Sequence, residues 1–174
     1  WSNQYFLLKE EWRANLRAGI GYDAHKLIPG KGMYLGGVFI KCDYALEAYS
    51  DGDVIIHSVI DSLLGAAALG DIGSLFSSKD PKNKDISSRV LLTQVMDLMD
   101  AKKYKVINVD ITLITETPKI NQKADLIIDS LSKDLRVEKG CVSCKATTTD
   151  GLGFEGEKRG IACQAVVLIE KRIK

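Results

Sequence analysis

The sequence predicts an α/β fold of the layered α+β kind, in which one mixed β-sheet is packed with helices on one side. Three observations support this prediction. Segments with strand-like alternation are separated by segments whose apolar residues recur at helical spacing. The 174 residues are 45% hydrophobic, which is enough for one core. No internal repeat is present, so we expect a single domain over residues 17–174, preceded by an extension over residues 1–16.

The first half of the domain is expected to form two strands and a long helix. The strands are predicted over Arg17–Asp23 and Met33–Ile40, joined by a loop containing proline and glycine. Over Asp53–Leu69 the apolar residues follow helical spacing, and Gly70 is a suitable stop. The segment Asp71–Asp85 is too polar for the core and contains a proline, so we expect a loop.

The second half alternates helices and strands. The expected elements are a helix from Ser87 or Ser88 to about Ala101, a strand over Val106–Thr115, a helix over Lys123–Leu135, and strands over Ser143–Thr149 and Ile161–Ile169. Strands separated by helices favour a layered domain of sheet and helices.

Composition argues against several classes of partner. The 24 basic and 23 acidic residues nearly cancel and form no basic stripe with interleaved aromatics, which argues against nucleic acid. No apolar run reaches the roughly 18 residues of a membrane helix. Among the four cysteines, Cys141 and Cys144 would face opposite sides of a strand, so we interpret all four as reduced, mostly structural thiols.

The chain has only two histidines, and both are candidates for a metal site. Asp23 and His25 are two residues apart, so in an extended segment they share a face and can reach one cation. His57 lies in the first turn of the predicted helix. Three ligands with an open fourth position are typical of catalytic zinc. Because the Asp-x-His pattern is short, two structural histidines and a surface aspartate are the alternative.

Acidic residues flank His57 on the predicted helix. Asp53 and Asp61 lie four residues before and after it, on the same face, where a carboxylate could orient the far nitrogen of a ligating histidine. A solvated acidic face is the alternative. Capping alone would also account for the Ser50–Asp53 sequence.

A third pattern suits phosphate. The run Lys145–Thr149 ends at Asp150 and a loop with several glycines. Hydroxyls, free backbone N–H groups and a lysine suit phosphate oxygens, and the acid can hold a divalent cation. An edge strand that enters a flexible turn is the alternative.

Together these blocks carry a resemblance. From about Ala18 to Lys171 the chain resembles the 2-C-methyl-D-erythritol 2,4-cyclodiphosphate synthase family of the non-mevalonate isoprenoid pathway. The resemblance rests on Asp23–His25, Ser50–Asp53 with His57, Leu63–Gly73, Thr117–Lys119 and Lys145–Thr149, in the family's order.

The resemblance implies a homotrimer with active sites between adjacent subunits. It implies Zn²⁺ held by Asp23, His25 and His57, and a second divalent cation, Mg²⁺ or Mn²⁺, at Asp150. Tyr49 and Thr148 occupy the catalytic positions. Asp71–Gly73 and the Phe76–Asp80 loop would meet the methylerythritol part, and Thr115–Asn121 and Thr147–Asp150 of the neighbouring chain would meet the cytidine and phosphates. The implied substrate-binding residues are Asp23, Ala24, His25, Tyr49, Ser50, Asp61, Asp71, Ile72, Gly73, Phe76, Ser78, Asp80, Thr115, Thr117, Pro118, Lys119, Ile120, Asn121, Thr147, Thr148, Thr149, Asp150, Phe154 and Glu157.

The implied reaction is a cyclisation. The substrate, 4-diphosphocytidyl-2-C-methyl-D-erythritol 2-phosphate, carries its own nucleophile, because a phosphate with a second pKa of about 6 is largely dianionic at neutral pH. Two cations would reduce the repulsion between its phosphates, and in-line binding would orient the attack. CMP leaves, and Thr148 donates a hydrogen bond to phosphoryl oxygens.

Three positions depart from the family pattern. Tyr49 stands where the family usually has histidine, and a phenol offers no cationic partner near neutral pH. The Phe76–Asp80 loop lacks a proline and an acid, which is expected to make it less rigid. Glu157 and Arg159 carry the usual two charges in exchanged order.

Two other functions and two compartments remain as alternatives. A zinc-dependent phosphohydrolase would use the same ligands with water as nucleophile. A trimeric nucleotide-binding module would bind CDP without releasing CMP. Because Trp1 replaces an initiator methionine, residues 1–16 are expected to be a transit-peptide remnant, with an ordinary extension as the alternative. The first favours a plastid-type organelle (apicoplast or chloroplast), and the second fits a bacterial cytoplasm.

Overall fold

The computed structural model describes residues 15–172 of the chain. Its strands are β1 (Leu16–Pro29), β2 (Met33–Leu35), β3 (Val38–Ile40), β4 (Tyr44–Glu47), β5 (Tyr104–Ile114), β6 (Val142–Thr147) and β7 (Gly160–Lys171). Its helices are α2 (Val54–Ala67), α3 (Ile72–Leu75), α4 (Ser88–Ala101), α5 (Ala124–Asp134) and α6 (Gly153–Gly156), with short 3₁₀ turns η1 (Pro81–Asn83) and η2 (Lys139–Cys141).

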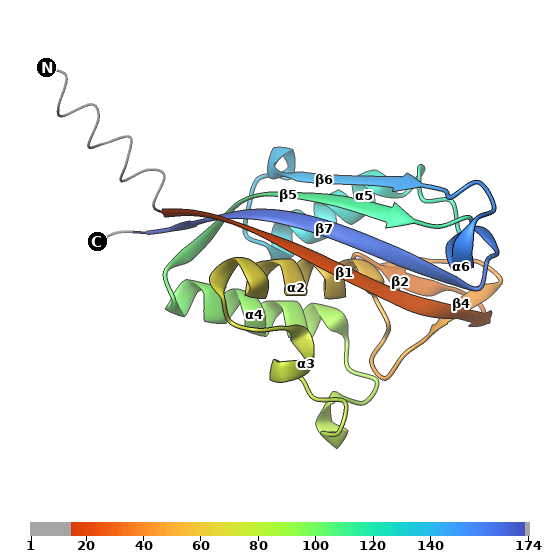
Figure 1. The fold of residues 1–174 in the computed structure, drawn as a ribbon, viewed down its shortest axis with the longest axis horizontal. Helices are drawn as coiled ribbons and strands as arrows, with labels where there is room; N and C mark the ends of the chain where they lie inside the picture. Colours follow the sequence, from red (N-terminus) through yellow and green to blue (C-terminus); the bar gives the residue numbers. More distant parts are fainter. Residues whose placement is uncertain (1–14, 173–174) are drawn as a thin grey trace, which may run out of the picture.

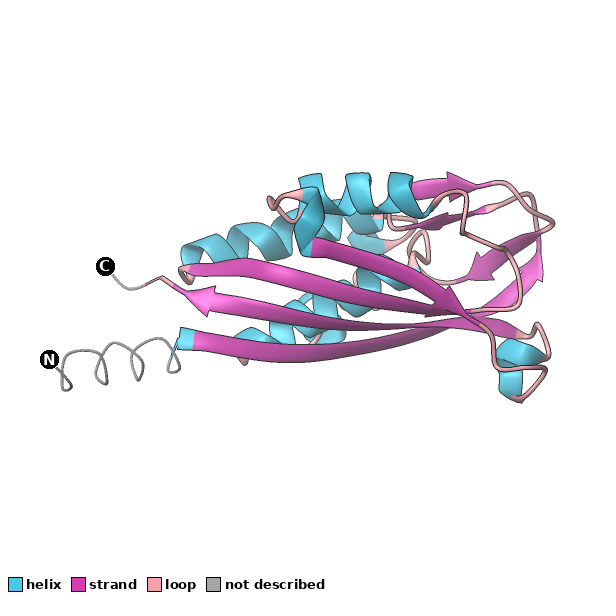
Figure 2. Ribbon diagram, turned by 90° about the horizontal axis from the view of Figure 1, so that it is seen from above, coloured by secondary structure: helices cyan, strands magenta, loops and turns pink. Residues whose placement is uncertain are grey.

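The main sheet is mixed, as the sequence predicted. Its five strands follow the order β4-β1-β7-β5-β6, in which only β5 and β6 are parallel. The long helices α2, α4 and α5 cover one face, as Figures 1 and 2 show together. The α2 helix packs against β1 and β7, α4 packs on α2, and α5 packs on β6. The predicted α/β layering with helices on one side is therefore confirmed.

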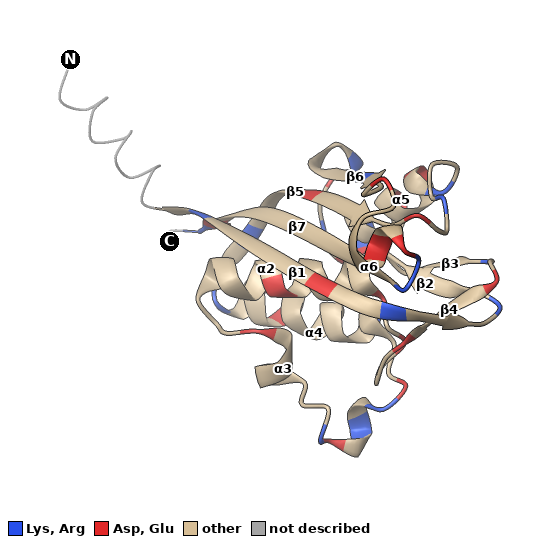
Figure 3. Cartoon of the chain, turned by 45° about the vertical axis from the view of Figure 1, so that its right-hand side comes forward, with Lys and Arg blue, Asp and Glu red and all other residues tan. Residues whose placement is uncertain are grey.

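The opposite face of the sheet is open in this chain. Along β1 the alternate residues Ile20 and Tyr22 are 62% and 53% exposed, while the residues between them face α2. Val166 on β7 is exposed on the same face, in register with Ile20. Figure 3 shows β7 without charged residues over most of its length, whereas β1 carries both an acidic and a basic segment.

Several elements differ from their predicted bounds. The predicted strand over residues 33–40 is the hairpin β2–β3, because Gly36 and Gly37 take positive φ values of 59° and 77° in a two-residue turn. The β1 strand continues six residues past the predicted end at Asp23 and pairs there with β4, a strand that the sequence did not predict. This extension places His25 inside a strand.

Close packing between β1 and α2 brings two segments of the site together. A Cβ atom at Gly19 or Gly21 would lie 2.0 or 1.9 Å from the backbone oxygens of Ser62 and Ser58 in α2. Because glycine carries no Cβ, the strand can rest on the helix backbone at these two positions. The strand residues that follow, including Asp23, therefore lie directly beside the first turns of α2.

The helices begin at different kinds of cap. Asp53 is the N-cap of α2, and its carboxylate accepts hydrogen bonds from the backbone N–H groups of Ile56, Gly36 and Gly37. Ser87, the predicted cap of α4, makes no capping bond with its side chain. Asp51, which is 37 residues away from Ser88, accepts the N–H of Ser88 instead.

The predicted extension over residues 1–16, and the compartment inferred from it, rest on residues outside the described range except Asn15 and Leu16. Leu16 begins β1, one residue before the predicted strand. Within residues 15–172, no helix has both the length and the apolar character that a membrane crossing requires.

Candidate metal centre and substrate site

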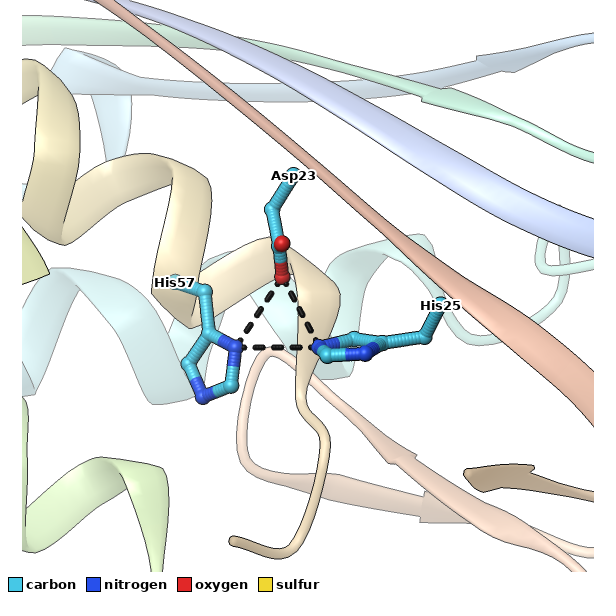
Figure 4. Close-up of side chains that lie close together, drawn as sticks. All are labelled: Asp23, His25 and His57. Carbon is cyan, nitrogen blue, oxygen red and sulfur yellow. Dashed lines mark hydrogen bonds and ion pairs between the residues drawn. The ribbon is translucent and has the colours of Figure 1, made fainter. Parts of the chain in front are cut away.

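Three side chains from β1 and α2 converge on one point (Figure 4). One Asp23 carboxylate oxygen, Oδ2, lies 2.9 Å from His25 Nε2 and 3.0 Å from His57 Nδ1. The two ring nitrogens are 3.2 Å apart. Asp23 and His25 share a face of β1, as their spacing predicted, and His57 reaches them from the first turn of α2. The predicted cluster is thus present in the structure.

The cluster is partly enclosed, and this changes the pKa values of its groups. Burial would raise the pKa of Asp23, but hydrogen bonds from His25 and His57 and their positive charge bring it far below its usual range. Burial would lower the pKa of His57, but Asp23 raises it above its ordinary value. Each group of this pair therefore stabilises the charged form of the other.

The donor set fits a divalent cation. One carboxylate and two imidazoles offer ligand atoms that all lie within 4.8 Å of one another, and within residues 15–172 this is the one such group of three. If both ring nitrogens present lone pairs, they repel across their short separation unless a cation lies between them. Imidazole nitrogen with carboxylate oxygen is a ligand set that suits zinc.

The far nitrogen of His57 faces two hydroxyls. Ser88 Oγ lies 2.9 Å from His57 Nε2, and Ser50 Oγ lies 3.2 Å from it. The prediction that Asp53 or Asp61 orients this ring is wrong. The Asp53 carboxylate is fully buried against backbone N–H groups of the β2–β3 turn, and Asp61 accepts the N–H of Ile72 at 2.8 Å.

A cavity of about 270 Å³ opens beside the cluster. His25 and His57 form one part of its wall. The other lining residues from the expected substrate set are Tyr49, Ser50, Ile72, Gly73, Phe76 and Ser78. The structure therefore brings these eight residues together around one space.

Other residues of the expected set shape the loop over this cavity. Asp71 caps α3 by accepting hydrogen bonds from the N–H and the hydroxyl of Ser74, and Asp61 accepts the N–H of Ile72, the first residue of the same helix. Burial raises the pKa of Asp61, and the nearby charges of Asp71 and Asp23 add to this effect. Asp80 caps η1, and its carbonyl accepts the Tyr49 hydroxyl at 3.3 Å.

The expected cytidine and phosphate segments form a separate cavity. Its volume is about 190 Å³, and its lining includes Thr115, Pro118, Lys119, Ile120, Asn121, Thr147 and Thr148. The peptide bond before Pro118 is cis, and Thr117 contributes the carbonyl that accepts Thr115 Oγ1. Thr149 binds the carbonyl of Leu152, and Asp150 is exposed with a positive φ of 53°. Within one chain, Thr148 and Asp150 are not brought to the Asp23 cluster.

The remaining expected residues lie at a third cavity or close to it in the chain. Ala24 and Phe154 line a cavity of about 460 Å³ together with His25 and Arg159. Glu157 forms an ion pair with Arg159, with 2.6 Å between Oε2 and Nε. The two exchanged charges therefore pair with each other inside one chain.

This chain is similar to a known protein family over almost its whole described length. The YgbB family model matches residues 16–170, which is nearly the whole described chain. The chain belongs to the YgbB family. Among curated relatives, the 2-C-methyl-D-erythritol 2,4-cyclodiphosphate synthase of Thioalkalivibrio sulfidiphilus is 50% identical over 157 residues, covering 90% of this chain and 98% of the relative.

Bifunctional relatives and solved structures agree with the YgbB assignment. The bifunctional enzyme IspD/IspF of Aliarcobacter butzleri is 46% identical over 156 residues, but the chain spans only 42% of its length. A solved structure of IspF from Plasmodium falciparum in complex with CDP matches with a TM-score of 0.81 and 38% identity, covering 91% of this chain and 98% of that one.

Sequence reasoning missed two residues of this YgbB site. Ser88 was expected only to cap its own helix, and Asp51 only to belong to a capping sequence. Ser88 contacts the ring of His57, which is 31 residues away in the chain. Asp51 accepts the N–H of Ser88, which is 37 residues away. Their sole sequence signal is a polar residue at a position that the structure buries, for Ser88, or half-buries, for Asp51.

Proposed function

We propose that this chain converts 4-diphosphocytidyl-2-C-methyl-D-erythritol 2-phosphate to 2-C-methyl-D-erythritol 2,4-cyclodiphosphate with release of CMP. The observation that carries the proposal is the Asp23–His25–His57 cluster at the wall of a cavity, in a YgbB domain whose full-length relatives are named for this synthase. The chemistry is that of a phosphorus–oxygen lyase in isoprenoid biosynthesis.

The proposed cofactors are Zn²⁺ at Asp23, His25 and His57, and Mg²⁺ or Mn²⁺ at Asp150. When bound, such cations neutralise phosphate charge and so reduce the repulsion between two phosphoryl groups. The residues of the chain position the substrate. Ile72 and Gly73 close one wall of the cavity, and Tyr49 points its hydroxyl along the loop over it.

The proposed bond changes need no water. An oxygen of the substrate's 2-phosphate forms a bond to the β-phosphorus, the bond from that phosphorus to the bridging oxygen breaks, and CMP leaves with that oxygen. The nucleophile is already anionic near neutral pH, so the proposal assigns no general base to the protein. Thr148 is proposed to donate a hydrogen bond to the phosphoryl oxygens.

We further propose that the chain works as a homotrimer with sites between subunits. Two features support this. The cavity that holds Thr148 is separate from the cavity beside His57, so one chain alone does not join the two halves of the site. The sheet face away from the helices exposes Ile20, Tyr22 and Val166, which form an apolar patch that suits burial against a second copy.

Bound cytidine diphosphate is proposed to lie at the cavity lined by Thr115, Pro118 and Lys119. The likeness to the CDP complex from Plasmodium falciparum supports a cytidine nucleotide as the ligand, and the proposed location rests on the resemblance together with this cavity. The relatives reported above are all named for cyclodiphosphate synthesis or for the bifunctional enzyme, so the comparisons give the phosphohydrolase prediction no support.

Turnover in ¹⁸O-labelled water tests the proposal. We expect ³¹P spectra and mass spectrometry to show the cyclic product and CMP, both without the label. Label in CMP or in a linear product would establish hydrolysis instead. Binding of CDP without any CMP release, with zinc and magnesium present, would identify a binding module.

A further inference from the structure

The ring of His57 has two nitrogens with different surroundings. Nδ1 faces Asp23 and His25, and Nε2 faces away from them, toward the start of α4. A neutral imidazole carries its proton on one nitrogen and a lone pair on the other. A cation at the cluster therefore requires the proton to lie on Nε2, and that proton needs an acceptor.

Ser88 is placed to be this acceptor. Its side chain is 0% exposed, and its hydroxyl lies 2.9 Å from Nε2. The same hydroxyl makes a short contact with Asp51 Oδ1, and the Ser88 N–H lies 2.9 Å from Asp51 Oδ2. Both oxygens of one carboxylate thus hold one serine.

The direction of each hydrogen bond follows from the donors available. An ionised carboxylate only accepts, so the Ser88 hydroxyl must donate to Asp51. Its own proton is then used, and the hydroxyl oxygen can only accept from His57 Nε2–H. The second nearby hydroxyl, on Ser50, lines the substrate cavity and is exposed to whatever binds there.

We propose that Ser88, fixed by Asp51, is a positioning residue that holds His57 in the tautomer with its lone pair on Nδ1, aimed at the cation site. This inference rests on the metal site of the proposed function. The arrangement resembles a carboxylate that orients a ligating histidine directly, except that the Ser88 hydroxyl lies between the Asp51 carboxylate and the His57 ring. Such outer partners orient the ring and increase its strength as a ligand.

The variant Ser88→Ala tests this directly, with zinc affinity measured by chelator competition on the full chain. Loss of an outer partner typically weakens metal binding about 10- to 100-fold, and we expect a loss in this range. Ser62→Ala is the matched control, because Ser62 is a fully buried serine on α2 whose hydroxyl, among residues 15–172, donates only to the carbonyl of Val59. The control is expected to bind zinc as the unmodified chain does, and Ser88→Thr, which restores a hydroxyl, is expected to recover much of the affinity.

A second variant avoids removing the buried hydroxyl. In Asp51→Asn only one side-chain oxygen can accept, so either the Ser88 N–H or the Ser88 hydroxyl loses its acceptor. We expect this change alone to weaken zinc binding several-fold, within the range above. If Ser88→Ala does not fold, this variant decides the question.

Histidine ¹⁵N spectra of the zinc-loaded protein give a readout that a merely structural role would not change. With only two histidines in the chain, we expect opposite tautomers, with the proton on Nε2 of His57 and on Nδ1 of His25. Unchanged zinc affinity in both Ser88→Ala and Asp51→Asn would overturn the inference while leaving the proposed function intact. A His57 proton on Nδ1 in the zinc-loaded protein would overturn the inference and would also remove His57 Nδ1 from the proposed zinc ligands. A chain without any cation affinity would contradict both.

Discussion

Asp23 Oδ2 and His57 Nδ1 lie 3.0 Å apart although the residues are 34 positions apart in the chain. This contact joins β1 to α2, and it exists because the strand rests on the helix backbone at two glycines. The candidate metal centre therefore depends on how closely a strand and a helix approach, as well as on the identity of its ligands.

Removal of His57 tests the metal centre itself. In His57→Ala one of three ligands is missing, so we expect zinc content to fall to about a tenth or less and CMP release to be lost. Far-UV circular dichroism and elemental analysis are the measurements, with the fold expected to persist. A fully active variant that contains no zinc would contradict the proposed role of the cluster.

The close contact between Gly21 and the α2 backbone predicts that a larger residue here lowers both the free energy of unfolding and the zinc affinity. In Gly21→Ala the new Cβ would lie 1.9 Å from the Ser58 carbonyl oxygen, so β1 and α2 must separate. Overpacking of this kind typically costs about 1–3 kcal/mol, and we expect a loss at the upper end in urea unfolding, together with weaker zinc binding. Gly140→Ala is the control, because nothing lies within 4 Å of its Cβ position. Equal stability of the two variants would refute this account.

Asp150 is expected to bind the second cation. We choose Asp150→Asn rather than alanine, because the residue has a positive φ of 53° that asparagine tolerates. Loss of the negative charge is expected to raise the magnesium concentration needed for half-maximal CMP release roughly tenfold, with zinc content unchanged. An unaltered response to magnesium would remove Asp150 from the site.

Tyr49 is the most informative departure from the family pattern. Its side chain lines the cavity beside His25, His57 and Ser50. A hydrogen bond from a charged group is stronger than one from a neutral phenol by about 1 kcal/mol, so Tyr49→His is expected to raise turnover roughly fivefold. Tyr49→Phe separates the hydroxyl from the ring. If neither variant changes the rate of CMP release, the residue does not contact the reacting phosphates.

The thiol of Cys163 provides a prediction on pH. Burial raises its pKa to about 12, so the folded protein keeps this thiol protonated while the unfolded chain ionises near pH 9. Stability from this group is therefore complete below pH 9 and is lost as the pH rises toward 12. We expect alkylation at pH 8 to miss Cys163 until urea unfolds the chain, as followed by mass spectrometry. Rapid modification in the native protein would show that the thiol is accessible.

Local patterns were sufficient for part of this structure. The alternation of β5 and β7 and the helical spacing of α2 place most core residues, because each pattern depends only on neighbours along the chain. The turn at Gly36 and Gly37 was missed although paired glycines carry a signal for it. The short strand β4 had no such signal, since its four residues are ordered only by pairing with β1.

The sequence by itself indicated which residues could hold a cation, because Asp23 and His25 are two residues apart and share a face wherever the backbone is extended. It also determined the family, through blocks of residues in a fixed order. Only the tertiary structure decided which atoms meet. His57 turns one nitrogen to Asp23 and the other to Ser88, and Asp51 closes the arrangement. These contacts join segments that are remote in the chain, so they depend on the packing of β1, α2 and α4, which no local pattern encodes.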